Sequence, residues 1–328
     1  MSAAPLRVGI VGCGLVGRKR AVALRADDTL VACTDADVDV AHRFAAEFGG
    51  QACVSAEQLF ELDPDVVVVA TPHDLLTPFA LVALEAGAHV LVEKPAGLGT
   101  AQVEEIARTA ERRGRMVKVG FNHRFHPGLA RAAEEVRSGR HGDVLYVRGR
   151  YGHGGRLGYE NEWRLQPERS GGGELVDQGM HLLDLVHWLA GPLPLHSALL
   201  RTQFWSAPVE DNAALLLGDA TDRQGPWALL HASWTEWKNT FSLEISCRTA
   251  KLAVDGLVRS YGPQTLSIYR MSPELGPPEL EVHTYPDEDV SWTREWEHFA
   301  KALAGEVELM GSPADAHYAW SRVEDAYR

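Results

Sequence analysis

The first 120 or so residues alternate short apolar runs with longer amphipathic stretches. The apolar runs are continuous rather than alternating, which is typical of parallel strands covered on both faces. The stretches between them carry apolar residues at helical spacing. The pattern predicts strands at 6–11, 30–34, 65–70, 89–93 and 116–120, and helices at 17–26, 38–48, 77–86 and 101–113. Strands that alternate with helices in this way form βαβ units and a parallel sheet.

The pattern changes after about residue 121, where the apolar runs become longer and more alternating. Alternation of this kind predicts a mainly antiparallel sheet with one covered face, in an α+β arrangement. A glycine-rich stretch at 152–158 and a proline-rich stretch at 273–278 interrupt the strands, and a closing helix is predicted at 313–327. The predicted strands are 144–151, 197–204, 213–217, 227–234, 241–247, 251–255 and 265–269.

Composition and charge narrow the classes of protein. A chain of 328 residues favours two domains, and 45% hydrophobic with 23% charged residues is ordinary for a globular protein. The net charge of −13 argues against nucleic acid and anionic membranes as partners. No apolar run approaches the length of about 20 residues that spans a bilayer, and the start of the chain does not resemble a signal peptide, so we expect a cytoplasmic protein.

The four cysteines are scattered along the chain, and none of them forms a CxxC pair. Scattered cysteines in an intracellular protein are usually buried thiols. We therefore expect neither a disulfide framework nor a metal site.

A glycine-rich turn joins the first predicted strand to the first predicted helix. Gly12 permits a tight turn, Gly14 lets the backbone approach a pyrophosphate, and Gly17 allows the helix to pack closely on the strand. Asp35 follows about 20 residues later, where a carboxylate binds the adenosine ribose and repels a 2′-phosphate. The pattern predicts NAD rather than NADP as the cofactor; the alternative is a glycine-rich turn without a ligand. The predicted contacts here are Gly12, Gly14, Leu15, Val16, Gly17 and Asp35.

Further segments make a resemblance to a known family specific. They are Ala70-Thr71-Pro72-His73, Glu93-Lys94-Pro95, the run 120–125 and the run 171–181, GGGELVDQGMH. Together with the glycine fingerprint and the ending around residues 318–320, they resemble the Gfo/Idh/MocA family of oxidoreductases. The resemblance extends over nearly the whole chain.

The resemblance implies an α/β fold with an N-terminal Rossmann domain, a doubly wound parallel sheet, at 1–121. A C-terminal α+β domain with a large, open, mainly antiparallel sheet would occupy 122–328, and its sheet commonly forms homodimers or homotetramers. Substrates in such a family are sugars, sugar nucleotides or cyclitols such as inositol. The cofactor contacts would extend to Ala70, Thr71, Pro72, His73, Glu93 and Lys94. His73 and Leu76 depart from the residues common in the family at those positions.

The resemblance also assigns catalytic roles. Lys94 matches a catalytic lysine whose bond to Pro95 is often cis, and Asp177 and His181 match a catalytic aspartate and histidine. Asp177 and His181 are four residues apart, so they share one face if the segment is helical. Histidine suits the general base that takes a hydroxyl proton, and a lysine stabilises the developing alkoxide. We expect His181 as base, Lys94 as oxygen-binding partner and Asp177 as the substrate-binding or orienting group.

Other residues are candidates for substrate binding. Trp163 could stack on a sugar face, and Arg124 or Arg164 could bind hydroxyls or an acidic group. Tyr151 lies just before them, so the predicted substrate contacts are Lys94, Arg124, Tyr151, Trp163, Arg164, Asp177 and His181. Two alternatives to a dehydrogenase remain open: a redox-neutral NAD-dependent glycosidase of the same fold, and a non-catalytic regulator that binds NAD(P). The presence of Lys94 and His181 disfavours the regulator.

Overall fold

The computed structural model describes residues 4–274 and 276–328; residue 275, in the predicted proline-rich break, lies outside the described part of the chain. The chain divides into two compact units. Unit 1 comprises the chain up to Asn122 together with Trp292–His317, and unit 2 comprises His123–Ser291 together with Tyr318–Arg328.

Unit 1 contains a parallel sheet of six strands in the order β3-β2-β1-β4-β5-β6. This order is that of a doubly wound dinucleotide-binding sheet, which confirms the predicted Rossmann fold. Such a sheet binds its ligand where the strand order reverses, here between β1 and β4. The strands are β1 (Arg7–Val11), β2 (Thr29–Thr34), β3 (Gln51–Cys53), β4 (Val66–Val69), β5 (His89–Val92) and β6 (Val117–Val119).

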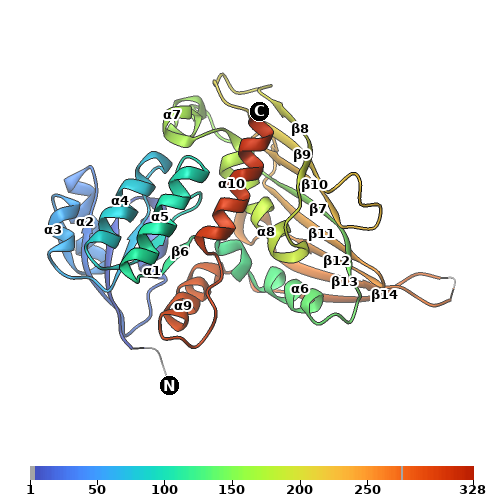
Figure 1. Cartoon of the computed structure of the whole chain (residues 1–328), viewed down its shortest axis with the longest axis horizontal. Helices are drawn as coiled ribbons and strands as arrows, with labels where there is room; N and C mark the ends of the chain where they lie inside the picture. The colour runs from blue at the N-terminus through green and yellow to red at the C-terminus, as the bar shows by residue number, and fades with distance from the viewer. Residues whose placement is uncertain (1–3, 275) are drawn as a thin grey trace. The chain divides into compact units, whose positions relative to one another are not determined.

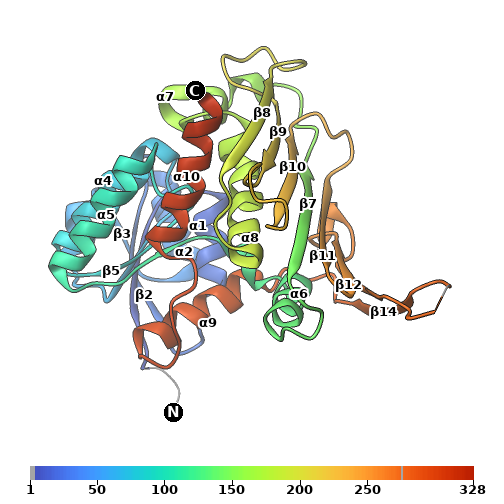
Figure 2. The ribbon, with the colours of Figure 1, turned by 45° about the vertical axis from the view of Figure 1, so that its right-hand side comes forward.

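Helices connect these strands, and α4 and α5 lie side by side in Figures 1 and 2. Asp37 caps α2, because its carboxylate accepts hydrogen bonds from the Asp39 and Val40 N–H groups. Gly114 ends α5 in the left-handed conformation. The helices are α1 (Leu15–Val22), α2 (Val38–Phe48), α3 (Ala56–Phe60), α4 (His73–Glu85), α5 (Thr100–Arg113) and α9 (Ser291–Leu303), of which Ser291 is counted with unit 2.

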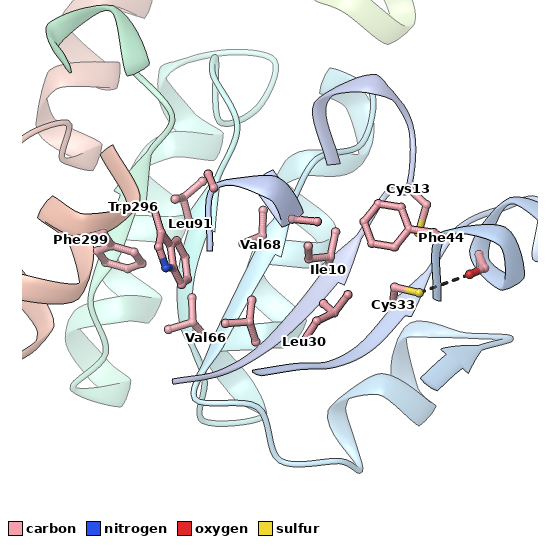
Figure 3. Close-up of a cluster of buried hydrophobic side chains, with 14 residues drawn as sticks. Ile10, Cys13, Leu30, Cys33, Phe44, Val66, Val68, Leu91, Trp296 and Phe299 are labelled. Atoms are coloured by element: carbon pink, nitrogen blue, oxygen red, sulfur yellow. Dashed lines mark hydrogen bonds between the residues drawn. The ribbon is translucent and has the colours of Figure 1, made fainter. Parts of the chain in front are cut away.

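The core of unit 1 explains why its strands are continuously apolar. All four valines of β4 are fully buried, and neighbouring strands contribute Ile10 and Leu91. Trp296 and Phe299 of α9 belong to the same cluster, as Figure 3 shows, although they follow β4 by more than 200 residues in the sequence. The N–H of Trp296 donates to the carboxylate of Asp28 at 2.7 Å, which satisfies the polar atom of this buried ring.

Unit 2 contains a sheet of eight strands in the order β14-β13-β12-β11-β7-β10-β9-β8. Neighbouring strands are antiparallel except β7 and β10, which are parallel. The large, mainly antiparallel sheet confirms the second part of the predicted fold class. The strands are β7 (Val144–Gly152), β8 (Leu195–Arg201), β9 (Asn212–Leu217), β10 (Trp227–Ser233), β11 (Thr240–Cys247), β12 (Ala250–Asp255), β13 (Thr265–Arg270) and β14 (Glu279–Thr284).

Helices α6 and α8 lie on one face of this sheet (Figures 1 and 2). The opposite face is open and carries large exposed side chains, among them Trp227, Leu229 and Val282. The longer helices are α6 (Pro127–Arg137), α8 (Met180–Ala190) and α10 (Pro313–Tyr327), whose residues from Tyr318 onward belong to unit 2. Helix α7 (Pro167–Ser170) is one turn, and a π-helical turn, Leu175–Gly179, leads directly into α8.

Candidate active site

The turn between β1 and α1 has the geometry of a phosphate-binding loop. Gly12 has φ of 97°, and a Cβ there would lie 2.5 Å from the carbonyl oxygen of Ala70. A Cβ on Gly17 would overlap the Gly12 carbonyl, so the helix packs closely on the turn. A Cβ on Gly14 would meet no described atom within 4 Å. The turn is therefore tight behind Gly12 and Gly17 and open at Gly14.

The amino end of α1 is suited to an anion. Among the described residues, no side chain caps it and no acidic residue lies in its first turn. Leu15, its first residue, is 74% exposed. The N–H groups of a first helical turn lack partners within the helix and carry partial positive charge. These features fit the pyrophosphate of a dinucleotide, which the residues from Gly12 to Gly17 would hold.

Asp35 lies just beyond the end of β2, where the sequence placed it. One of its carboxylate oxygens accepts a hydrogen bond from the Cys13 N–H at 2.7 Å, and the other accepts from the Asp37 N–H at 3.1 Å. The carboxylate is thus fixed beside the glycine-rich turn. A fixed negative charge at this position fits the ribose hydroxyls of NAD and disfavours a 2′-phosphate.

Lys94 lies in the loop after β5, which is hydrogen-bonded to side chains of α4 and α5. The Lys94–Pro95 bond is cis, and Ala96 has φ of 69°. The hydroxyl of Thr77 in α4 donates to the Ala96 carbonyl at 3.0 Å. Gln102 of α5 accepts from the Leu98 N–H at 2.8 Å. The loop after β5 is therefore held from two helices.

Glu93 points into the interior of unit 1. It is 8% exposed and accepts a hydrogen bond from the Arg20 guanidinium at 2.6 Å. Arg20, 1% exposed, also donates to Glu295 at 2.5 Å, and Lys118 lies 3.2 Å from Glu295. Burial raises the pKa of Glu93 above its ordinary value even though Arg20 lies beside it. Because its carboxylate is engaged in this charge network, we leave Glu93 out of the proposed cofactor contacts.

The segment from Ala70 to His73 joins β4 to α4. Thr71 and Pro72 precede the helix, and His73 is its first residue, 6% exposed. Leu76 is fully buried on the same helix. The leucine that departs from the family pattern is therefore a core residue of unit 1.

The segment carrying Asp177 and His181 lies in unit 2 and is held at its amino end by a buried carboxylate. Glu210 accepts hydrogen bonds from the Gly173 and Leu175 N–H groups, at 3.2 and 3.0 Å, and from the Tyr327 hydroxyl at 2.8 Å. A Cβ on Gly173 would overlap the Glu210 carbonyl, so only glycine fits there. Burial raises the pKa of Glu210 above its ordinary value despite these donors.

Asp177 belongs to the π-helical turn, whereas His181 belongs to α8. The segment is helical, but its first turn is wider than an α-helix. Two residues four apart are then not stacked as they would be in a regular α-helix. Single π-helical turns occur often at functional sites.

His181 is 7% exposed and stacks on a second histidine. Its ring lies 3.8 Å from the ring of His123, at an interplanar angle of 24°. The ring of Tyr151 lies 6.2 Å from His181 and 5.2 Å from His123. The three rings thus form one cluster in unit 2.

Asp177 lies beside an arginine that the sequence singled out. Its carboxylate is 3.5 Å from Arg164 Nε, and its side chain is 15% exposed. Arg164 also lies 3.3 Å from Glu162 and its guanidinium is 4.7 Å from the ring centre of Trp163. The structure therefore brings Asp177, Trp163 and Arg164 together in one part of unit 2.

Two tyrosines accompany this group. Burial raises the pKa of Tyr151 well above its ordinary value and raises the pKa of Tyr261 to about 12. Both hydroxyls thus keep their protons at neutral pH, so neither is a base. Sequence reasoning missed Tyr261, Gln178 and His123. His123 and Gln178 stand within the motifs that were recognised, whereas no local signal marks Tyr261.

Arg124 is an internal residue of unit 2. Its guanidinium donates twice to Asp184, at 2.9 and 2.5 Å, and the two side chains are 3% and 0% exposed. Asp184, three residues after His181 in α8, is therefore paired with Arg124. We leave Arg124 out of the proposed substrate contacts for this reason.

Within residues 4–274 and 276–328, no group of three or more His, Cys, Asp or Glu side chains is placed to hold a metal ion. No helix in the described part of the chain has the length and apolar character needed to cross a bilayer.

The fold and the glycine-rich turn define an NAD-binding Rossmann unit joined to a second unit built on a large open sheet. Residues 6–121 match the family profile described as "Oxidoreductase family, NAD-binding Rossmann fold". Residues 129–253 match the profile described as "GFO/IDH/MocA C-terminal domain". The chain belongs to the Gfo/Idh/MocA family.

Curated relatives include named sugar dehydrogenases. The chain is 33% identical over 198 residues to D-glucoside 3-dehydrogenase of Escherichia coli (strain K12), a match that covers 58% of this chain and 56% of the relative. It is 28% identical over 235 residues to levoglucosan dehydrogenase of Pseudarthrobacter phenanthrenivorans, covering 67% of this chain and 60% of the relative. The matches thus span less than two thirds of these relatives' own lengths.

Solved structures share the fold over nearly the whole chain. An NAD-binding oxidoreductase from Klebsiella pneumoniae has a TM-score of 0.86 at 21% identity, covering 99% of this chain and 96% of the other. Levoglucosan dehydrogenase in complex with NADH and levoglucosan also has a TM-score of 0.86 at 21% identity, covering 98% and 97%.

Proposed function

We propose that the chain is an NAD-dependent dehydrogenase or ketoreductase that acts on a hydroxyl-bearing carbon of a sugar. The observation that carries the proposal is the group formed in unit 2 by the stacked His181 and His123 with Asp177 nearby. A neutral imidazole can accept the proton of a sugar hydroxyl. The relatives named as sugar dehydrogenases support sugars as the substrate class.

In the proposed reaction, His181 takes the hydroxyl proton while the carbon loses hydride. NAD, when bound, supplies the acceptor for that hydride. Lys94 stabilises the alkoxide that develops on the oxygen, since a cation there is worth more as the charge grows. Asp177, held beside Arg164, binds a neighbouring hydroxyl and orients the sugar. Trp163, Arg164 and Tyr151 complete the proposed substrate contacts.

The proposed cofactor is NAD in preference to NADP. Asp35 supports this preference, because both oxygens of its carboxylate are fixed by backbone N–H groups and present a negative charge. The contacts proposed for the cofactor are the turn from Gly12 to Gly17, Asp35, the segment from Ala70 to His73, and Lys94.

We also propose that copies of the chain associate through the open face of the sheet in unit 2. The pairing of β10 with β9, and of β9 with β8, places Leu229, His231 and Leu199 on this face. Trp227 stacks on Tyr146 there, at 4.9 Å. Exposed apolar side chains gathered on one face are typical of association surfaces.

The test is a spectrophotometric assay of the full chain with NAD or NADP against aldoses, glycosides, inositols and nucleotide sugars. We expect NADH to form with at least one neutral sugar, and a His181→Ala variant to lose roughly 10²–10⁴-fold in kcat. The variant should bind NAD as tightly as the wild type, measured by fluorescence titration. Unchanged turnover in the variant would remove His181 as the base. Conversion of a glycoside without net NADH would indicate the redox-neutral glycosidase instead.

A further inference from the structure

The turn between β12 and β13 in unit 2 has a backbone that its side chains disfavour. Val258 has φ of 62° and Arg259 has φ of 51°. Positive φ is a true outlier for a β-branched residue such as valine. Outliers of this kind persist when the surroundings fix them, and they gather at functional sites.

Two contacts hold this turn in place. The Arg259 N–H donates to the Asp287 carboxylate at 2.7 Å, and Asn239 donates to the Ser260 hydroxyl at 2.9 Å. Val258 itself is 3% exposed. The result of the unusual backbone is the placement of the next aromatic residue, Tyr261, against the catalytic segment.

Tyr261 is half-buried and meets the π-helical turn through Gln178. The side-chain N–H of Gln178 donates to the Tyr261 hydroxyl oxygen at 3.0 Å. The ring of Tyr261 lies 5.5 Å from the ring of Tyr151, which in turn neighbours His181. Asp177 is close enough to influence the Tyr261 hydroxyl electrostatically. Tyr261 and Gln178 therefore stand within the proposed substrate group.

Gln178 has an unfilled hydrogen-bonding position. Its side chain is 6% exposed, and among the described residues its carbonyl oxygen Oε1 has no hydrogen-bond partner. A buried amide oxygen without a donor costs free energy that a ligand donor would recover. Tyr261 holds its proton, so its hydroxyl can accept from Gln178 and donate to a further acceptor.

We propose that Gln178 and Tyr261 form a pair that binds one sugar hydroxyl other than the one that is oxidised; this inference rests on the proposed function. The sugar hydroxyl donates to Gln178 Oε1 and accepts from the Tyr261 hydroxyl, which accepts from Gln178 Nε2. Every polar atom of the pair is then satisfied. A site built in this way discriminates strongly against an analogue that lacks the hydroxyl. Gln178 and Tyr261 are thus specificity-determining residues.

The experiment compares methyl β-D-glucopyranoside with its monodeoxy analogues, using the full chain and NAD. Three proteins are assayed: the wild type, Tyr261→Phe and Gln178→Leu. We expect either variant to lower kcat/KM for the parent glucoside roughly tenfold. The wild type should discriminate against one monodeoxy analogue that lacks a hydroxyl other than the oxidised one. Both variants should use this analogue as well as they use the parent glucoside. This loss of discrimination at a single position is a readout that a general structural weakening would not give.

Controls separate the outcomes. Tyr146→Phe, on the open face of the sheet, is the matched tyrosine control and should keep wild-type discrimination at every position. Thermal unfolding and NAD titration check that each variant is folded. If the wild type oxidises the glucoside and both variants keep its full discrimination, the inference is wrong while the proposed function stands. If the wild type oxidises none of the aldoses, glycosides, inositols and nucleotide sugars of the assay described above, the proposed function fails and the inference fails with it.

Discussion

Two buried glutamates support the two regions that carry the predicted catalytic residues, and they do so by different means. In unit 1, Glu93 precedes Lys94 directly and is engaged by Arg20, which also binds Glu295. In unit 2, Glu210 holds the segment before Asp177 with two backbone N–H groups and a tyrosine hydroxyl. One carboxylate is matched by charge and the other by neutral donors.

The two regions should therefore respond differently when one of these contacts is removed. Removing one member of a buried ion pair leaves an uncompensated charge, which is among the most destabilising changes in a protein. Removing a carboxylate that accepts from neutral donors leaves unsatisfied N–H groups, which costs less. We therefore expect the loss of a single partner to lower the free energy of unfolding more around Glu93, next to Lys94, than around Glu210.

The largest expected effect is that of Arg20→Ala. The substitution leaves Glu93 and Glu295 buried without their shared cation, so we expect a loss of about 3–5 kcal/mol in the free energy of unfolding. Urea unfolding measures it. Arg18→Ala is the matched control, because Arg18 pairs with Glu47 at the surface, with both side chains nearly half exposed. A surface pair of this kind is worth about 0–1 kcal/mol. Equal losses in the two variants would contradict the comparison.

A smaller effect is expected for Glu210→Ala, which strands the N–H groups of Gly173 and Leu175. We expect a loss of about 2–3 kcal/mol in the free energy of unfolding, below that of Arg20→Ala. Because Asp177 follows these N–H groups closely, kcat should also fall while the affinity for NAD is unchanged. Urea unfolding, steady-state kinetics and NAD titration give the three values. A loss exceeding that of Arg20→Ala would reverse the proposed ranking.

The smallest effect concerns pH. Burial raises the pKa of Glu210 in the folded protein, so the folded state holds its proton to higher pH than the unfolded state. The stabilisation from this group is therefore full below the unfolded pKa and is lost as pH rises through the folded pKa. Glu210→Gln cannot titrate, so we expect the variant to gain stability relative to the wild type as pH rises from about 4 toward neutrality. If the difference in free energy of unfolding between the variant and the wild type is the same at every pH, the pKa of Glu210 is not raised in the folded protein.

Most of the fold follows from local patterns, because β4 is wholly apolar and its neighbours β1 and β5 carry only one polar residue each, at their first position. Helix α10 occupies the predicted range 313–327. The elements not predicted are the short α3 and β3, the strand β14, and two longer helices, α6 and α9. Strand β14 is mostly exposed, and β3 has three residues. The packing of α9 in the core of unit 1 depends on contacts across more than 200 residues, which periodicity does not reveal.

The candidate site likewise combines residues whose positions follow from local sequence with residues that only tertiary contacts bring together. The turn at Gly12 and the carboxylate of Asp35 are set by local sequence, and both lie where the pattern predicts. The engagement of Arg124 by Asp184 is a tertiary contact, so Arg124 looked available in the sequence. Tyr261 arrives from a loop some 80 residues beyond Gln178, by way of an unfavourable backbone at Val258. Only the three-dimensional structure brings such residues together.

The four cysteines are all buried: Cys13, Cys33 and Cys53 in unit 1 and Cys247 in unit 2. A thiol reagent can reach these cysteines only when the surrounding chain unfolds locally. The rate of thiol modification therefore reports on local unfolding. Mass spectrometry that measures the modification rate of each cysteine would therefore report the local unfolding of each unit separately, with the natural cysteines as probes. NAD should slow the reaction of Cys13 most, because Cys13 belongs to the turn that would hold the dinucleotide and its buried thiol contacts the Thr34 carbonyl.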